Sequence, residues 1–182
     1  MRIIAGNWRG RRIVAPKGDT TRPTADRTRE TLFSMLASRL GSFEGLRVGD
    51  FFAGSGALGL EALSRGAAHC IFVEQDAEAL KALRANVAAL GAEADIRASS
   101  VLSLGQAPAP LDLLLLDPPY GTNAGAVALD KLQRLGWIGP ASWISLETGR
   151  GDPAIVSTLE LDAQRSVGKA QITMLRGSSA PE

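Results

Sequence analysis

The chain has 182 residues, of which 45% are hydrophobic and 21% charged, so it can form one domain with a buried core and is neither disordered nor fibrous. The formal net charge is only +1, but residues 1–47 hold ten Lys and Arg against four Asp and Glu, which indicates a basic segment attached to a more acidic body. A single cysteine and a single histidine exclude a disulfide within the chain and a zinc site built from Cys and His alone.

Residues 1–45 are predicted to form a basic extension made of a hairpin and a helix. The hairpin spans residues 2–14, with a turn between Gly6 and Gly10. Thr24 is expected to cap a helix that runs to about Arg39. The extension lacks the apolar segment of a signal peptide, and no stretch of the chain approaches the roughly 18 apolar residues of a membrane span. These features predict a cytoplasmic protein without a membrane partner.

Residues 46–176 alternate between strand-like and helix-like segments, which predicts an α/β domain with a doubly wound, Rossmann-like parallel sheet. The chain then ends in a predicted hairpin and a frayed, disordered tail over 177–182. The expected strands are 46–52, 69–74, 94–98, 111–116 and 141–147, the expected helices are 58–64, 77–90 and 126–135, and the hairpin strands are 159–167 and 171–175.

A glycine-rich loop follows the first strand of this domain. Gly54, Gly56 and Gly59 match the spacing of a dinucleotide fingerprint, and Glu74 ends the second strand, where an acid can accept hydrogen bonds from ribose hydroxyls. Asp50 lies just before the loop, and its carboxylate would repel the pyrophosphate of NAD. Asp50 therefore favours S-adenosylmethionine, which is cationic and has no phosphate, over NAD. A purely structural tight turn is the alternative to a nucleoside-binding loop.

The fourth strand ends in Asp117-Pro118-Pro119-Tyr120, at the edge where doubly wound sheets bind ligands. Because the two prolines remove two N–H donors, the backbone there presents carbonyl acceptors without competing donors. The Asp117 carboxylate and the Pro118 carbonyl could accept both hydrogens of an exocyclic amino group on a base and free its lone pair, while Tyr120 stacks on the extruded base. A rigid proline turn that merely ends a strand is the simpler alternative.

Basic residues are concentrated in the N-terminal extension. A flexible arm of this kind would grip phosphates and position the enzyme without reading sequence. Trp8 either stacks on a base or packs against the body, and a solvated pair of charged strands remains the alternative. The predicted RNA-binding residues are Arg9, Arg11, Arg12, Lys17 and Arg22. Arg29, in contrast, falls on the apolar side of its helix, which favours a role in the pocket or core.

Residues 2–12, 22–33 and 54–66, together with the glycine loop and the Asp-Pro-Pro-Tyr turn, resemble the RsmD family of bacterial small-subunit ribosomal RNA guanine-N2 methyltransferases. The resemblance implies a seven-stranded sheet with an antiparallel last strand and S-adenosylmethionine as cofactor, with S-adenosylhomocysteine as product and no metal. It also implies methylation of one guanine N2 in 16S rRNA, with the assembled small subunit as preferred substrate and a monomeric enzyme.

The resemblance also assigns site residues. The catalytic turn would comprise Asp117, Pro118, Pro119 and Tyr120, and the cofactor site would comprise Asp50, Ala53, Gly54, Gly56, Glu74, Gln75, Ser100, Val101 and Thr24. At Ser100 the sequence departs from the family, which often has Asp or Asn there, so contact with the adenine amino group would be weaker.

Three alternatives remain. A DNA adenine-N6 or cytosine-N4 methyltransferase would use the same turn but generally carries a target-recognition segment for which this chain has no room. An NAD-dependent oxidoreductase accounts for the glycine loop and leaves the Asp-Pro-Pro-Tyr turn unexplained. A ribosome-assembly factor that retains an inactive methyltransferase fold would need no intact site, whereas both halves of the site look intact.

Overall fold

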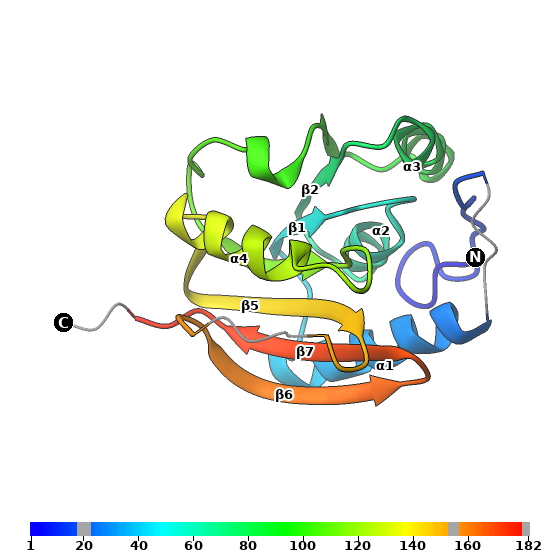
Figure 1. Ribbon diagram of the computed structural model, residues 1–182. Coiled ribbons are helices and arrows are strands. Elements are labelled where there is room, and N and C mark those ends of the chain that lie inside the picture. Colours follow the sequence, from blue (N-terminus) through cyan, green and yellow to red (C-terminus); the bar gives the residue numbers. More distant parts are fainter. Residues whose placement is uncertain (18–22, 153–156, 180–182) are drawn as a thin grey trace.

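The computed structural model describes residues 1–17, 23–152 and 157–179, and in it a single seven-stranded sheet lies between two layers of helices (Figure 1). The strand order is β3-β2-β1-β4-β5-β7-β6. Strands β1 to β5 run parallel, whereas β7 is antiparallel to both of its neighbours, β5 and β6. The elements are α1 Pro23–Leu40, β1 Arg47–Phe51, α2 Ala57–Ser64, β2 His69–Glu74, α3 Ala77–Leu90, β3 Asp95–Ala98, the 3-10 helix η1 Val101–Ser103, β4 Leu111–Leu116, α4 Ala124–Arg134, β5 Ile138–Gly149, β6 Glu160–Val167 and β7 Ala170–Arg176.

Apolar residues on both faces of the central strands create two cores. In β4, Leu113 and Leu115 pack on one side of the sheet with residues of α1, α2 and α3, while Leu114 and Leu116 pack on the other side with α4 and η1. Successive side chains of a strand point to opposite faces, so the all-leucine run of β4 serves both cores. The predicted doubly wound sheet, its seven strands and its antiparallel terminal hairpin are confirmed.

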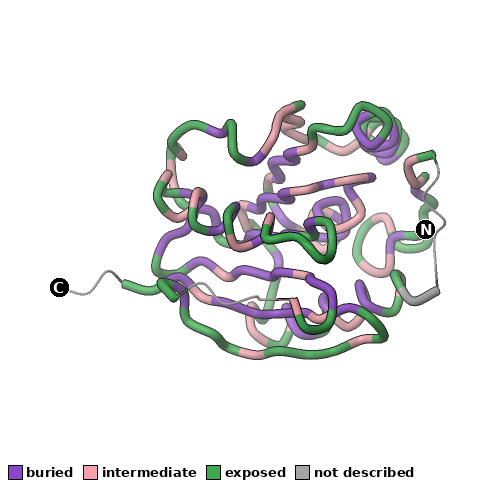
Figure 2. The backbone as a smooth tube through the Cα atoms, viewed as in Figure 1, coloured by how far each residue is buried: buried purple, intermediate pink, exposed green. Residues whose placement is uncertain are grey.

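The β6–β7 hairpin forms one edge of the sheet, and β6 is mostly exposed whereas β7 is mostly buried (Figure 2). The first two residues of the segment predicted as a frayed tail, 177–182, make hydrogen bonds to neighbouring segments. The Gly177 amide donates to the Ser142 carbonyl at 3.0 Å, and the Ser178 hydroxyl donates to the Thr158 carbonyl at 2.8 Å. These bonds extend the ordered edge of the sheet, and residues 180–182 lie outside the description.

The N-terminal segment packs on the same core as the sheet. Ile3 and Ile13 are buried in the cluster that α1, α2 and α3 cover. The predicted hairpin is short: Arg2 and Arg12 form one antiparallel bridge, and the amides of Ile3 and Ile13 donate to the carbonyls of the opposite arm. Several amides of the intervening turn bond to α2 instead of across the hairpin. The described part of the predicted arm is therefore fixed to the body. No helix within residues 1–17, 23–152 and 157–179 is long and apolar enough to cross a bilayer.

Helix α1 begins at Pro23, one residue before the predicted cap. Proline suits the first position of a helix, where its missing N–H has no partner to lose. Thr24 is consequently part of the first turn and does not precede it, and its side chain lies outside the described part of the structure, as does Arg22.

Candidate active site

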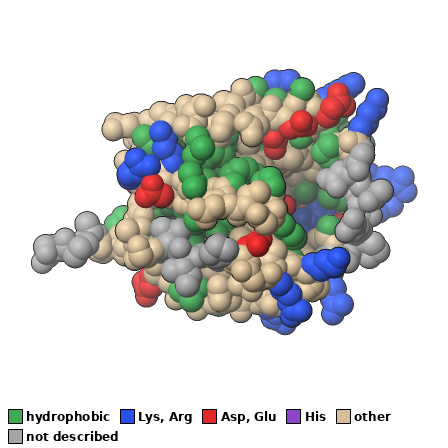
Figure 3. All heavy atoms as spheres, in the orientation of Figure 1, with side chains coloured by type: hydrophobic (Ala, Val, Ile, Leu, Met, Phe, Trp, Pro, Cys, Tyr) green, Lys and Arg blue, Asp and Glu red, His purple; other side chains and the backbone are tan. Residues whose placement is uncertain are grey.

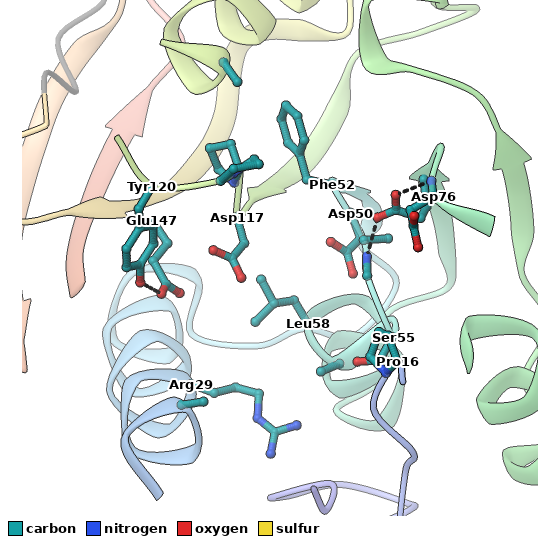
Figure 4. Close-up of a pocket in the computed structure, with 18 of the residues that line it drawn as sticks. Pro16, Arg29, Asp50, Phe52, Ser55, Leu58, Asp76, Asp117, Tyr120 and Glu147 are labelled. Atoms are coloured by element: carbon teal, nitrogen blue, oxygen red, sulfur yellow. Dashed lines mark hydrogen bonds between the residues drawn. The ribbon is translucent and has the colours of Figure 1, made fainter. Parts of the chain in front are cut away.

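A cavity of about 710 Å³ opens at the carboxyl ends of the parallel strands. Its walls come from the N-terminal segment, α1, the glycine loop, the end of β2, the Asp-Pro-Pro-Tyr turn and β5. Figure 4 shows the two sequence-predicted halves of the site facing this one space, with Asp50 on one side and Asp117 on the other. A volume of this size lies within the roughly 300–1,000 Å³ of small-molecule sites.

Asp50 is a buried acid whose two oxygens have different surroundings. Its side chain is 1% exposed, and Oδ2 accepts the Gly59 amide of α2 at 2.8 Å. Oδ1 is buried and has no hydrogen-bond partner. Burial, with the nearby Glu74 charge adding to it, raises the pKa of Asp50 to about 8, although the Gly59 amide acts in the opposite direction. Such a group would gain most from a cationic ligand, because the cation would pair with its unsatisfied oxygen.

The glycine loop is shaped by close packing and by Glu74. Gly56 has φ +82°, and a Cβ there would lie 2.4 Å from Leu83 Cδ1. A Cβ on Gly59 would lie 2.4 Å from Phe72 Cε1, so α2 approaches β2 more closely than any other residue would permit. At the end of β2, Glu74 Oε2 accepts the Gly54 amide at 2.8 Å.

Glu74 also accepts the amides of Gln75 and Asp76 through Oε1, both at 2.8 Å. A carboxylate offers about four acceptor positions, so three amides leave room for one further donor. Gln75 and Ala53 line the same cavity. The loop, the end of β2 and the start of α3 are thereby held together around a single acid.

Phe52 separates the main cavity from a second, smaller one. Its φ is +63°, a left-handed conformation that costs a bulky residue about 1–2 kcal/mol. The residue lines both the main cavity and a space of about 30 Å³ that is also lined by Ser100 and Val101. Val101 is buried, and the Ser100 hydroxyl accepts the Leu102 amide at 3.2 Å as the cap of η1. These two predicted cofactor-site residues are thus absent from the lining of the main cavity and line the adjoining small one.

The Asp-Pro-Pro-Tyr turn leaves β4 at the opposite wall. Asp117, Pro118, Pro119 and Tyr120 all line the cavity, and the Tyr120 side chain is 45% exposed. The Tyr120 hydroxyl donates to Glu147 Oε1 on β5. Partial burial raises the pKa of both partners, and the hydrogen bond raises the Tyr120 pKa further while it opposes the rise at Glu147. The tyrosine therefore stays protonated and its ring is fixed at the cavity mouth.

A second acid fastens the same turn to β5. Asp152 Oδ2 accepts the Gly121 amide at 2.9 Å and the Gly149 amide at 3.0 Å. One oxygen thus joins the residue after Tyr120 to the last residue of β5. Because the two prolines cannot donate, the side chains of β5 and the residues after it supply much of what holds this turn.

Arg29 of α1 forms the cavity wall between the two halves of the site. It is 5% exposed, and its Nη2 donates to the Arg2 carbonyl at 2.6 Å and to Asp26 Oδ1 at 3.1 Å. Its Nη1 is buried and has no hydrogen-bond partner. Figure 4 shows the guanidinium extending from α1 toward Ser55 and Pro16. The expectation that Arg29 serves the pocket or core is confirmed.

The N-terminal segment reaches the cavity because α2 and α3 bind its backbone. The buried Glu61 accepts the amides of Ile4 and Ala5 at 2.8 and 3.0 Å. The Asn86 side chain accepts the Val14 amide and donates to the Ser55 carbonyl, so α3 joins this segment to the glycine loop. Met1 and Pro16 line the cavity as a result.

The predicted RNA-binding side chains are exposed on this docked segment. Arg9, Arg11, Arg12 and Lys17 are all exposed, and Arg11 also donates to the Ala89 carbonyl of α3 at 2.6 Å. Figure 3 shows Lys and Arg side chains around the side of the molecule where the N-terminus lies, beside the hollow of the cavity. Trp8 is partly buried against the core, which favours packing over base stacking.

Sequence analysis did not identify Glu147 and Asp152 as site residues. A signal existed for Glu147, because it is the one acid in an otherwise apolar and small-residue strand expected over 141–147. Neither its pairing with Tyr120 nor the bond from Gly121 to Asp152 could be inferred, since the sequence does not give the order of β4 and β5 in the sheet.

Comparisons with known proteins agree with this geometry. Residues 1–176 match the family model described as conserved hypothetical protein 95. The chain is 36% identical over 173 residues to ribosomal RNA small subunit methyltransferase D of Escherichia coli K12, covering 93% of this chain and 86% of that protein. It is 39% identical over 131 residues to the putative rRNA methyltransferase YlbH of Bacillus subtilis, covering 66% of this chain and 67% of that protein.

Solved structures give the same result. The structure of the putative methyltransferase yhhF from Escherichia coli superimposes with a TM-score of 0.85 at 35% identity and covers 98% of this chain and 99% of its own. A putative methylase from Haemophilus influenzae superimposes with a TM-score of 0.81 at 31% identity, covering 98% of each chain.

Proposed function

Because this chain belongs to the conserved hypothetical protein 95 family, the family of RsmD, we propose that it is an S-adenosylmethionine-dependent methyltransferase of small-subunit ribosomal RNA. Its proposed target is the N2 of a guanine in 16S rRNA. One observation carries the proposal. A single cavity holds a buried acid with an unsatisfied oxygen, Asp50, opposite a turn of hydrogen-bond acceptors that begins at Asp117.

The charges in the cavity fit the amino-acid end of this cofactor. Asp50 Oδ1 and Arg29 Nη1 are both buried, both lack a partner and belong to residues that line the cavity. A zwitterionic ligand would satisfy both, its ammonium group beside Asp50 and its carboxylate beside Arg29. A pyrophosphate would instead lie beside the Glu74 charge and would form no ion pair with Asp50, which argues against a nicotinamide dinucleotide.

The remaining cofactor contacts follow the same wall. Glu74 retains acceptor capacity for a ribose hydroxyl after its three backbone amides. The small cavity lined by Ser100 and Val101 lies beyond Phe52 and suits the edge of a base. Ala53, Gly54 and Gly56 would let the loop backbone approach the ligand, and Thr24, in the first turn of α1, is assigned to the same cofactor site as a proposal.

The opposite wall suits an amino group on a base. When bound, the cofactor supplies an electrophilic methyl group on a sulfonium. The Asp117 carboxylate and the Pro118 carbonyl accept the two amino hydrogens and so orient the nitrogen lone pair toward the cavity, and the Tyr120 ring stacks on the extruded base. Asp117 can then accept the proton that leaves the nitrogen. Holding the base in this orientation supplies much of the rate.

The target RNA would be held by the exposed basic residues of the docked N-terminal segment, through its phosphates. The proposal places the enzyme with ribosomes in the cytoplasm. It acts as a monomer in this view, because one chain supplies both halves of the cavity.

The direct test is to incubate the protein with methyl-labelled S-adenosylmethionine and small ribosomal subunits that lack the modification, and then to digest the RNA to nucleosides. We expect label in N2-methylguanosine. Label in another nucleoside would keep the cofactor and reject the guanine assignment. Binding of the cofactor without any transfer to RNA would reject the enzymatic function on this substrate.

A further inference from the structure

The hydrogen bonds assigned to the Asp-Pro-Pro-Tyr turn do not explain why a guanine would be chosen. Guanine N2, adenine N6 and cytosine N4 are all amino groups with two hydrogens, and acceptors at Asp117 and Pro118 would bind each of them. The bases differ at the ring nitrogen beside the amino-bearing carbon. Guanine has an N1–H donor there, whereas adenine N1 and cytosine N3 are bare acceptors. A side chain that accepts a hydrogen bond at this ring nitrogen would distinguish guanine from the other two bases.

Strand pairing places a second carboxylate beside the turn. Leu116, the last residue of β4, is paired with Leu146 of β5 in a parallel register. Asp117 and Glu147 directly follow these two partners, and continuing the register by one residue makes them neighbours. Neighbouring strands lie about 4.8 Å apart, and in-register residues of parallel strands point to the same face. Figure 4 shows the Asp117 and Glu147 side chains extending in the same direction into the cavity.

Glu147 has acceptor capacity to spare. The Tyr120 hydroxyl occupies one position on Oε1, and a carboxylate has about four such positions on its two oxygens. The hydroxyl also fixes the rotamer of the carboxylate relative to the ring on which a base would stack. A base on Tyr120 would thus have its polar edge beside two carboxylates and a proline carbonyl, with no N–H donor from the two prolines.

We propose that Glu147 determines the choice of base by accepting the guanine N1–H while Asp117 and the Pro118 carbonyl accept the N2 hydrogens, an inference that rests on the proposed function. Three donors on guanine then meet acceptors only. Adenine or cytosine would place a ring-nitrogen lone pair against the Glu147 carboxylate, which leaves both groups unsatisfied and repulsive.

A purely structural role for Glu147 would act through Tyr120 alone. It would orient the ring for stacking and would lower the rate with every base to the same extent. The two roles therefore differ in selectivity between bases, and the rate on guanine alone does not separate them.

The experiment compares the rates of methyl transfer to two bases at the same position of the RNA. One is the guanine that the first test labels, and the other is 2-aminopurine in subunits reconstituted with RNA that carries this substitution. 2-Aminopurine keeps the amino group at C2 but has no N1–H. We expect the wild type to transfer methyl to guanine roughly ten- to a hundredfold faster, the range typical of one hydrogen bond to a charged group. In Glu147→Gln, whose amide can accept or donate, this ratio should fall to within about threefold of unity.

Two variants provide the controls. Tyr120→Phe removes the hydroxyl and keeps Glu147, so its rates should fall while the guanine preference persists. Glu160→Gln makes the same change at an exposed position on β6 and should match the wild type in both rate and preference. Binding of S-adenosylhomocysteine checks that each variant is folded. If Glu147→Gln fails this check, Glu147→Asp replaces it. This variant withdraws the carboxylate by one methylene and should also lower the ratio of the rates on guanine and 2-aminopurine.

A wild-type enzyme that methylates both bases at similar rates would overturn the inference, as would a glutamine variant with an unchanged ratio. Either result would leave the proposed function intact, because guanine would still be labelled. If the wild type transferred no label to guanine in unsubstituted small subunits, the proposed function itself would be rejected.

Discussion

The two halves of the cavity are held by contacts of different sequence separation. In the glycine-loop half, Asp50 bonds to Gly59 nine residues away and Glu74 to Gly54 twenty residues away. In the catalytic-turn half, Tyr120 bonds to Glu147 across 27 residues and Gly121 to Asp152 across 31. The contacts of the first half lie within one local βαβ unit. The contacts of the second half form only because β5 lies next to β4 in the sheet.

Their chemistry differs as well. The glycine-loop half presents acids that are fixed by backbone amides, with a buried oxygen on Asp50 that has no hydrogen-bond partner. The catalytic-turn half presents side chains that hold one another at the cavity mouth. Substitutions in the first half should therefore change ligand affinity, and substitutions in the second should change rate and base choice.

The largest expected effect is on rate, from Asp117→Ala. Loss of the carboxylate removes the acceptor that orients the amino group and takes its proton, so kcat should fall by about 10²–10⁴ while S-adenosylhomocysteine still binds. Asp112→Asn, at the other end of the same strand, is the matched control and should keep near-normal turnover. Single-turnover rates with small subunits measure the effect, and near-normal turnover of Asp117→Ala would reject the catalytic assignment of the turn.

Asp50→Asn should lower cofactor affinity by roughly ten- to a hundredfold, because a neutral amide pairs poorly with an ammonium or sulfonium group. The wild type should also show a pH dependence. With a pKa of about 8 the unliganded acid is mostly protonated at neutral pH, and a cationic ligand favours the ionised form. Affinity should therefore rise by at most about tenfold per pH unit up to pH 8 and then level off.

Calorimetric titration with S-adenosylhomocysteine from pH 6 to pH 9 measures this dependence, and buffers of different ionisation enthalpy report the proton released on binding. The slope should be absent in Asp50→Asn. A wild-type affinity that does not change with pH would show that Asp50 does not face the cationic end of the ligand.

Much of the fold and of the first half of the site could be predicted from the sequence. The apolar run 111–116 and the spacing of Gly54, Gly56 and Gly59 are local signals, and they correctly gave a central strand and a loop against α2. The order of the strands and the residue that abuts Asp117 are set by packing between segments far apart in the chain, so Glu147 was not identified.

The position of the N-terminal segment also depends on contacts between distant parts of the chain, which the sequence does not reveal. Its basic composition predicted an arm on the surface, but the buried Glu61 and the two isoleucines that pack into the core fix it to the body. The acid that binds its amides lies more than fifty residues away on α2, where the sequence indicates pairing with Arg65 four residues on but not with the amides of Ile4 and Ala5.

Arg29→Met should weaken S-adenosylhomocysteine binding by about tenfold, through loss of a charge-assisted bond to the ligand carboxylate. The sharper test uses 5′-methylthioadenosine, which lacks the amino-acid end of the cofactor. Its affinity should be the same for the variant and the wild type. Equal weakening of both ligands would mean that the substitution disturbs the cavity through the Arg2 and Asp26 contacts and that Arg29 does not bind the carboxylate.

The smallest expected effect comes from Asp152→Ala, which removes the acceptor shared by Gly121 and Gly149. The turn would keep its proline geometry and the Tyr120 bond to Glu147, so kcat should fall only about three- to tenfold. Cofactor affinity should stay the same, because the bonds that hold Asp50 and Glu74 in the glycine-loop half run to Gly59 and Gly54 and do not involve Asp152. Asp130→Ala is the matched control, because Asp130 is an exposed acid on α4 that pairs with Arg134 four residues on. If Asp152→Ala weakened S-adenosylhomocysteine binding as much as it slowed transfer, the two halves would be coupled and the separation between affinity and rate would fail.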